Sequence, residues 1–210
     1  MNSIKINKLK RFNSNNIVLF MTDKRDHINT INNAIDKNIL KCNVAGCVTN
    51  KINTYNYINK NFDIPSYLIK WDKKNESRYI YEKRIIEKIQ YLNPNILLLT
   101  GWKHIFTNYF INNFNHIINI HPALPNSYIG LNCIEKAYND YKINKIDYSG
   151  LMIHYITEEL DRGHVLEYRK VPILKNDTLD KLTERFRIYE KEPIINSLQK
   201  ISKLQIHLDK

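Results

Sequence analysis

The segment Glu76-Ser-Arg-Tyr-Ile-Tyr-Glu-Lys-Arg-Ile-Ile-Glu-Lys-Ile-Gln-Tyr-Leu-Asn-Pro-Asn-Ile-Leu-Leu-Leu-Thr100 joins an amphipathic stretch to a short apolar run. Apolar residues recur at helical spacing through 76–92, and Asn93-Pro94 ends that pattern. The run Ile96–Thr100 has the length and composition of a buried strand. A helix that leads directly into a buried strand is the repeating unit of a parallel sheet, so this segment indicates an α/β fold.

The same alternation of strand and helix extends on both sides of this segment. Upstream, we expect a strand at 16–22, a helix at 26–36 and a strand at 41–48; downstream, we expect a short helix at 106–114 and a strand at 117–120. Residues 49–74 show no period and receive no assignment. The first half therefore predicts a mostly parallel, twisted sheet with helices on both faces.

The second half of the chain has a different pattern. Two stretches, 148–157 and 164–171, are typical of strands, and the turn between them is short enough for them to pair antiparallel. From Asp177 onward the spacing predicts a long C-terminal helix, with a kink expected at Pro193. We interpret residues 1–14 as a flexible basic extension and residues 15–210 as a single domain.

Composition excludes several classes of site. The chain has five glycines, and none are spaced as in a Walker A loop or a dinucleotide fingerprint. The formal net charge is +11, but lysine and arginine are spread along the chain, which favours a basic surface and makes a nucleic-acid partner unexpected. Three cysteines without CxxC spacing favour neither disulfides nor zinc and indicate a reducing, cytoplasmic compartment. We expect no membrane span and no secretory signal.

Two polar residues close the strand predicted at 117–120. Asn119 and His121 are two positions apart, so they share one face of that strand. Asp161 follows in the turn after the next predicted strand. An asparagine, a histidine and an aspartate close together could act as an oxyanion donor, a general acid or base, and an orienting carboxylate. The alternative is a structural histidine before proline, hydrogen-bonded to a loop carbonyl.

Several segments together resemble the glycinamide ribonucleotide formyltransferase family. These are Asn119-Ile-His-Pro-Ala-Leu-Pro125, Gly130, Glu135-Lys-Ala-Tyr138, Gly150-Leu-Met-Ile-His-Tyr155 and Glu158-Glu-Leu-Asp-Arg-Gly163, with supporting matches from about Arg78 to Ile201. The resemblance implies transfer of a formyl group from 10-formyltetrahydrofolate to a primary amine, with no metal. It places Asn119, His121 and Asp161 on the family's catalytic positions.

The resemblance also implies where the cosubstrate binds. The pterin would be held by Trp102, His104, Ile105 and Phe106 after one strand, and by Thr157, Glu158, Glu159 and Leu160 before the catalytic aspartate. Backbone groups supply most of that hydrogen bonding in the family. The alternative for Trp102 and Phe106 is ordinary apolar packing.

The chain departs from the family at the acceptor end. A glycine-rich phosphate loop follows the first strand in the family, whereas this chain has Asp23-Lys-Arg-Asp-His27. Lys24 and Arg25 could bind a phosphate through their side chains, or the segment could be a plain helix-capping turn. Arg187 and Glu190 are the further candidates for acceptor binding, because Glu190 matches the position that contacts the acceptor's ribose.

This departure favours a changed acceptor. We therefore expect the amino group of a nucleotide-linked amino sugar, with glycinamide ribonucleotide as the second choice. A non-catalytic basic binding protein on the same fold is a third alternative, against which the intact Asn119, His121 and Asp161 argue. The expected partners are small-molecule substrates, with a homodimer left open.

Overall fold

The computed structural model describes residues 15–23 and 26–208, so the predicted extension at 1–14 lies outside the described residues. The strands are β1 (Asn15–Met21), β2 (Cys42–Thr49), β3 (Ser66–Leu68), β4 (Ile96–Thr100), β5 (Ile117–His121), β6 (Tyr148–Tyr155) and β7 (Val165–Pro172). The helices are α1 (Asp26–Asp36), α2 (Ile52–Asn61), α3 (Arg78–Ile89), α4 (Asn108–Ile111), α5 (Cys133–Lys142), α6 (Leu179–Tyr189) and α7 (Lys191–Leu208), with a 3-10 turn η1 (Gln90–Leu92) after α3.

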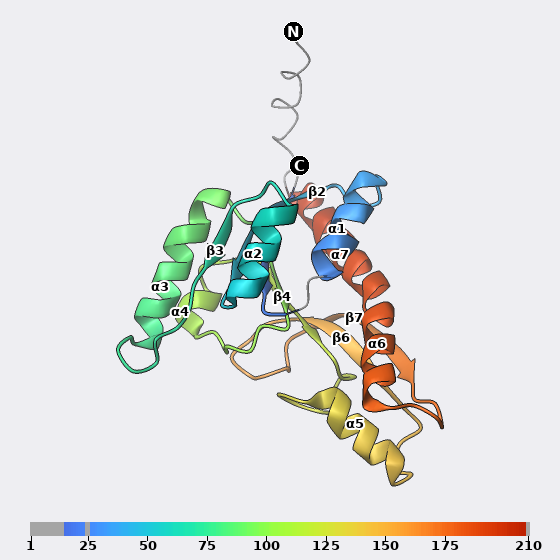
Figure 1. Ribbon diagram of the computed structural model, residues 1–210. Coiled ribbons are helices and arrows are strands. Elements are labelled where there is room, and N and C mark those ends of the chain that lie inside the picture. The colour runs from blue at the N-terminus through green and yellow to red at the C-terminus, as the bar shows by residue number, and fades with distance from the viewer. Residues whose placement is uncertain (1–14, 24–25, 209–210) are drawn as a thin grey trace.

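The strands form one sheet in the order β3-β2-β1-β4-β5-β6-β7 (Figure 1). All pairs from β3 to β5 are parallel, while β5 pairs with β6 and β6 with β7 in the antiparallel sense. The predicted fold class is confirmed. The chain reverses its direction of travel across the sheet between β1 and β4, and ligands in α/β sheets bind at such switch points.

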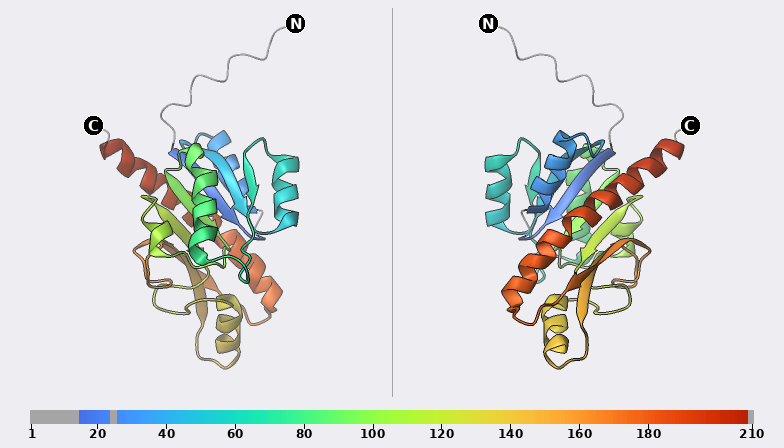
Figure 2. Two further views of the ribbon diagram at one scale, coloured as in Figure 1. Left: turned by 90° about the vertical axis from the view of Figure 1, so that its left-hand side faces the viewer. Right: turned by 90° about the vertical axis from the view of Figure 1, so that its right-hand side faces the viewer.

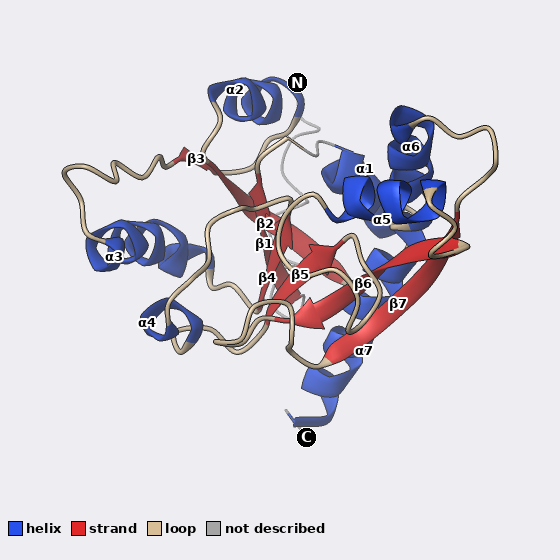
Figure 3. Cartoon of the chain, turned by 90° about the horizontal axis from the view of Figure 1, so that it is seen from below, coloured by secondary structure: helices blue, strands red, loops and turns tan. Residues whose placement is uncertain are grey.

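Helices cover both faces of the sheet (Figure 3). Ile28 of α1 and Ile194 of α7 pack with Leu19 and Leu98 on one face. On the other face, Tyr81 and Ile85 of α3 and Phe110 of α4 pack with Phe20 and Leu97. Figure 2 shows α7, at the red end of the colour bar, running obliquely over one face of the sheet. The alternation of side-chain direction along each strand supplies both cores from the same short apolar runs.

The segment 76–100 folds as a helix followed by a strand, as expected, and the helix α3 has a defined cap at its start. The side chain of Ser77 accepts a hydrogen bond from the backbone N–H of Ile80 and caps α3. Asn93 adopts a left-handed conformation with φ 46°, which ends the 3-10 turn and lets the chain enter β4. The chain then follows β4 directly into the region where the polar residues gather.

The structure corrects several of our assignments. Residues 49–74 contain α2 and β3, and α5 was not predicted. The helix expected at 106–114 is one turn long, Asn108–Ile111. The long C-terminal helix is two helices that meet at Glu190, and Pro193 lies in the first turn of α7. The interruption expected near Pro193 is therefore present but lies at Glu190, because Pro193 has no N–H for the carbonyl of Tyr189 and is accommodated in the first turn of a new helix.

No helix in the described part of the chain combines the length and apolar character needed to cross a bilayer.

Candidate active site

Strand β5 delivers Asn119 and His121 to one face of the sheet. Ile118 and Ile120 alternate with them along the strand and point into the core beneath α1 and α7. Asn119 lies opposite His154 of the neighbouring strand β6 in the antiparallel register, which adds a second imidazole to the same face. His121 is almost completely buried, with 3% of its surface exposed.

Asp161 reaches this face from the loop between β6 and β7. Its backbone is left-handed, with φ 56°, a conformation that aspartate tolerates better than most residues. Two residues later, a Cβ at Gly163 would lie 1.7 Å from the carbonyl oxygen of Tyr155. Only glycine lets the loop pass this close to β6, so Gly163 helps to fix where Asp161 points.

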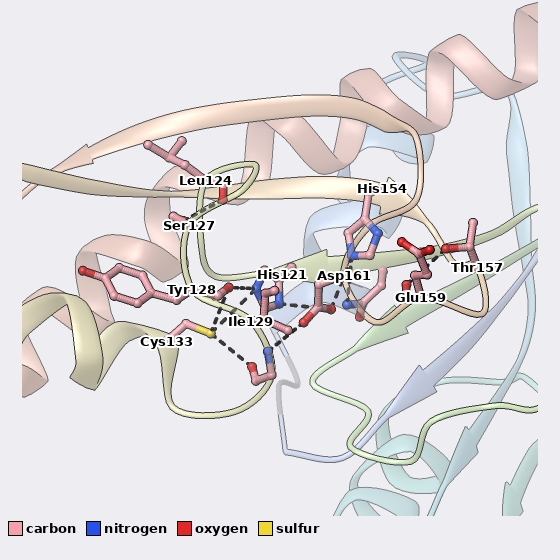
Figure 4. Close-up of polar contacts among 12 residues, drawn as sticks. His121, Leu124, Ser127, Tyr128, Ile129, Cys133, His154, Thr157, Glu159 and Asp161 are labelled. Atoms are coloured by element: carbon pink, nitrogen blue, oxygen red, sulfur yellow. Dashed lines mark hydrogen bonds and ion pairs between the residues drawn. The ribbon is translucent and has the colours of Figure 1, made fainter.

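The side chains of His121 and Asp161 form a pair (Figure 4). His121 Nδ1 lies 3.4 Å from Asp161 Oδ1. The other carboxylate oxygen, Oδ2, accepts the backbone N–H of Gly130 at 2.8 Å. The structure therefore brings together the three residues expected from the sequence, although Asn119 reaches Asp161 only through His154.

A backbone carbonyl determines which nitrogen of His121 carries a fixed proton. His121 Nε2 lies 2.7 Å from the carbonyl oxygen of Tyr128, and a carbonyl can only accept, so Nε2–H donates. Nδ1 is left facing the carboxylate of Asp161. Nδ1 is therefore the nitrogen placed to exchange a proton with that carboxylate.

His154 is a site residue that our sequence reasoning did not select. Its Nδ1–H donates to the carbonyl of Tyr155 at 2.9 Å, which leaves Nε2 as an acceptor for the Asn119 amide Nδ2 at 3.4 Å. Burial lowers the pKa of His154, so the ring stays neutral and can accept that bond. His154 therefore orients the amide of Asn119. The sequence places His154 in the motif Gly150–Tyr155, but it does not show that β6 pairs with β5 so that His154 lies opposite Asn119.

A buried thiol also touches the pair. Cys133 Sγ lies 3.7 Å from His121 Nε2 and 3.1 Å from the carbonyl oxygen of Gly130. Burial raises the pKa of this thiol, which keeps it protonated and unreactive. Cys133 does not line the adjoining cavity and serves as packing behind the imidazole.

A cavity of about 340 Å³ opens in front of these side chains. It is lined by Leu99, Gly101–Phe106, Asn119–Pro122, Gly130–Asn132, His154, Ile156, Thr157 and Glu159–Asp161. Of the residues expected to bind the cosubstrate, all but Glu158 line it. Glu158 instead pairs through its carboxylate with Asn108 of α4 and faces away.

The wall of the cavity is largely apolar and aromatic. Trp102 and Phe106 lie nearly parallel, with ring centroids 6.2 Å apart, and both meet Phe20 edge-on. Ile105 and Leu160 are 58% and 41% exposed and line the cavity, so they offer apolar surface to a ligand there. Burial, and then the charges of nearby cations, lower the pKa of His104, so this ring is neutral in the wall.

The acceptor residues expected from the sequence do not gather in this cavity. Lys24 and Arg25 lie outside the described residues, and Arg187 is exposed on α6 and absent from the cavity lining. Glu190 is 1% exposed and pairs with His27 Nε2 at 2.8 Å. One oxygen of this carboxylate, Oε1, is therefore engaged within the protein.

Within the described residues, no group of three or more His, Cys, Asp or Glu side chains is placed to hold a metal ion. The arrangement instead supports acid–base chemistry and stabilisation of a developing oxyanion in a partly enclosed cavity.

Comparison with known proteins gives a consistent result. Residues 15–198 match the family described as Formyl transferase. The chain is 33% identical over 202 residues to the phosphoribosylglycinamide formyltransferase of Dictyostelium discoideum, covering 89% of this chain and 98% of that protein. It is 26% identical to the Escherichia coli protein of the same name, covering 91% and 90% of the two chains.

A solved structure shares the fold at low sequence identity. Glycinamide ribonucleotide transformylase 1 from Symbiobacterium toebii superposes with a TM-score of 0.82 at 18% identity, covering 96% of this chain and 93% of that chain. With the family match over residues 15–198 and the cavity beside Asn119, His121 and Asp161, this chain belongs to the formyl transferase family, enzymes that use 10-formyltetrahydrofolate as the formyl donor.

Proposed function

We propose that this protein is a phosphoribosylglycinamide formyltransferase, which moves the formyl group of 10-formyltetrahydrofolate to the amino group of glycinamide ribonucleotide. The observation that carries the proposal is the 33% identity to the Dictyostelium protein of that name across 98% of its length. This reverses our order of acceptors, in which a nucleotide-linked amino sugar came first. We also propose that residues 15–210 act as one domain in the cytoplasm.

The cavity fits a folate. A flat ring system in this cavity would cover the exposed apolar side chains of Ile105, Leu131 and Leu160, which the buried rings of Trp102 and Phe106 support from behind. Bound there, the cosubstrate supplies an activated formyl group. The residues that would hold it are those of the segments 102–106 and 157–160, apart from Glu158.

Two side chains are placed to stabilise negative charge. When an amine attacks the formyl carbon, charge grows on the formyl oxygen. The Asn119 amide has one N–H directed to His154 and a second N–H available for that oxygen. Protonated His121 would add a positive charge beside it, and in a water-poor cavity such preorganised groups lower the barrier strongly.

The His121–Asp161 pair is placed to move the proton. The attacking nitrogen must lose one proton, and the departing folate nitrogen must gain one. The pair has one exchangeable proton between His121 Nδ1 and Asp161 Oδ1, so it can give a proton to one nitrogen and take one from the other. The pair ends each turnover as it began.

A nucleotide-linked amino sugar is the second candidate acceptor. It is favoured by the segment 23–27, which lacks the glycines of the family's phosphate loop, and by the buried pairing of Glu190 with His27. Both features alter the end of the site where the acceptor's ribose and phosphate would bind.

An acceptor panel tests the proposal. The purified chain is mixed with 10-formyltetrahydrofolate and either glycinamide ribonucleotide or one of several nucleotide-linked amino sugars, and release of tetrahydrofolate is measured. We expect efficient turnover with glycinamide ribonucleotide. Turnover confined to an amino sugar would replace the proposed acceptor, and no turnover with any amine would favour a non-catalytic binding protein.

A further inference from the structure

A loop between β5 and α5 orients both members of the His121–Asp161 pair. The carbonyl of Tyr128 accepts the Nε2–H of His121, and the N–H of Gly130 donates to Asp161. The two contacts come from positions only two residues apart. Any shift of this short segment, residues 128–130, would therefore disturb the imidazole and the carboxylate together.

The backbone of this loop makes few hydrogen bonds within the loop itself. Asn126, Gly130 and Asn132 all have positive φ, at 62°, 78° and 60°, so the loop turns repeatedly through conformations that most residues avoid. Its local hydrogen bonds run from Ser127 to the carbonyl of Leu124. A loop of this kind needs an anchor from outside to hold one conformation.

Three residues of α5 supply such anchors: Lys136 Nζ donates to the carbonyl of Ile129 at 3.2 Å, the Cys133 thiol to that of Gly130, and Asp140 holds the side chain of Tyr128. The phenol of Tyr128 donates to Asp140 Oδ2 at 2.7 Å, and Lys145 Nζ lies 3.3 and 3.2 Å from the two carboxylate oxygens. Burial first, and then Asp140, raise the pKa of Tyr128 to about 12, so the phenol remains a donor. The bond to Tyr128 holds the pKa of Asp140 below its ordinary range, so the acceptor remains charged.

Asp140 lies apart from the chemistry. It lines a separate surface hollow of about 560 Å³ on the far side of Tyr128, and it is absent from the cavity that holds His121. The groups that face His121 itself are Asp161, His154 and the thiol of Cys133. Among the described residues, the hydrogen bonds that connect Asp140 to the imidazole run through Tyr128.

We propose that the Asp140–Tyr128 hydrogen bond sets the proton position on His121, and that Asp140 and Tyr128 are positioning residues for formyl transfer. With the bond in place, the Tyr128 carbonyl keeps a proton on Nε2 and reserves Nδ1 for exchange with Asp161. Without it, the carbonyl turns away, and the neutral ring can place its proton on Nδ1 instead. The proposal rests on the proposed role of His121 in catalysis.

The test compares Tyr128→Phe and Asp140→Ala with a matched control. Tyr138→Phe makes the same change on α5, where the lost phenol bond is to the backbone carbonyl of Asp177 at 3.1 Å. We expect Tyr128→Phe and Asp140→Ala each to lower kcat about tenfold with little change in KM, the effect of one lost hydrogen bond on a transition state. Tyr138→Phe should keep the wild-type kcat.

Three further measurements separate positioning from general damage. Asp140→Asn keeps an acceptor and should restore most of kcat, and the double variant Tyr128→Phe/Asp140→Ala should be no slower than either single one. The acidic limb of the kcat–pH profile should move in both single variants. Imidazole ¹⁵N spectra of the folded chain should show His121 gaining the Nδ1–H tautomer.

The spectra also keep the two proposals apart. If the wild-type chain formylates no acceptor, the proposed function fails, while the tautomer of His121 is still measured directly. A wild-type ¹⁵N spectrum and pH profile in Tyr128→Phe would overturn the positioning role. So would a loss of kcat in Tyr138→Phe equal to that in Tyr128→Phe.

Discussion

At the residue scale, the candidate site centres on one carboxylate. Asp161 holds a left-handed backbone conformation that costs roughly 1 kcal/mol or more, and its side chain meets His121, His154 and the N–H of Gly130. Those contacts offset the strain. A residue held this way is ready for chemistry before substrate arrives, which is the property that electrostatic catalysis requires.

Replacing Asp161 by asparagine should separate chemistry from folding. Asparagine tolerates the left-handed conformation and still accepts the Gly130 N–H, so the fold should stay intact. The proton shared with His121 is lost, and turnover should fall by about 10² to 10⁴. Steady-state kinetics measures the loss of turnover, and far-ultraviolet circular dichroism checks that the fold is intact. A wild-type kcat would contradict the assignment of Asp161 to catalysis.

Two glycines near Asp161 should respond differently to alanine. Gly163→Ala places a Cβ against the backbone carbonyl of Tyr155, so the loop must move and both stability and kcat should fall, with a stability loss of about 2 kcal/mol or more. Gly130→Ala meets only Leu160 Cδ2 at 4.0 Å, an ordinary contact, and should cost about 1 kcal/mol through its positive φ. Equal melting temperatures for the two variants would count against this reading.

At the element scale, the entry to α6 depends on one buried aspartate. Asp177 accepts the backbone N–H of Leu174 at 2.8 Å and a two-point bond from Arg185 of α6. Its backbone carbonyl accepts the phenol of Tyr138 in α5. The aspartate therefore ties α6 to the preceding turn and to α5, which carries the anchors of the site loop.

Asp177→Asn should lower stability by about 1–3 kcal/mol at neutral pH, because a charge-assisted pair is broken. The bond to Arg185 lowers the pKa of Asp177 below its ordinary value of 3.8. Stabilisation by this group is thus present above about pH 4 and is lost as the pH falls through the folded-state value. Denaturant unfolding at pH 7 and pH 3 should show the variant's deficit shrinking in acid.

A matched substitution in the same helix is available as the control. Asp180 is exposed in the first turn of α6. Asp180→Asn should change stability by no more than about 0.5 kcal/mol at either pH. If both variants lost the same stability, the effect would belong to the helix terminus rather than to the Arg185 bond.

At the scale of the whole molecule, segments far apart in the chain enclose the cavity. One wall follows β4, another precedes β7, and the loop between β5 and α5 closes the third side. None of these segments encloses a ligand alone. Binding of a folate should therefore stabilise the complete fold rather than one element.

A folate analogue at about 100 times its Kd should add about 2.7 kcal/mol to the free energy of unfolding, which corresponds to a rise in Tm of roughly 5–10 °C for a chain of this size. Differential scanning fluorimetry measures the shift. Leu160→Asp, which puts a charge on the apolar wall, should lower it. An unchanged Tm at saturating analogue would contradict the assignment of this cavity to the cosubstrate.

Much of the fold could be predicted from local pattern. The helix 26–36 and the buried strands follow from periodicity, because burial of one face imposes that spacing on the sequence itself. The segments α2 and α5 were missed because their apolar positions are few, and their packing against distant strands supplies the stability.

The sequence by itself determined that Asn119 and His121 share a face, because side chains alternate along a strand. Only the tertiary structure decided what those side chains do to one another. The proton on His121 Nε2 depends on Tyr128, the amide of Asn119 on His154, and Glu190 is engaged by His27 from 163 residues away. Hydrogen bonds between residues on different elements and loops leave no periodic trace in the chain, whereas burial does.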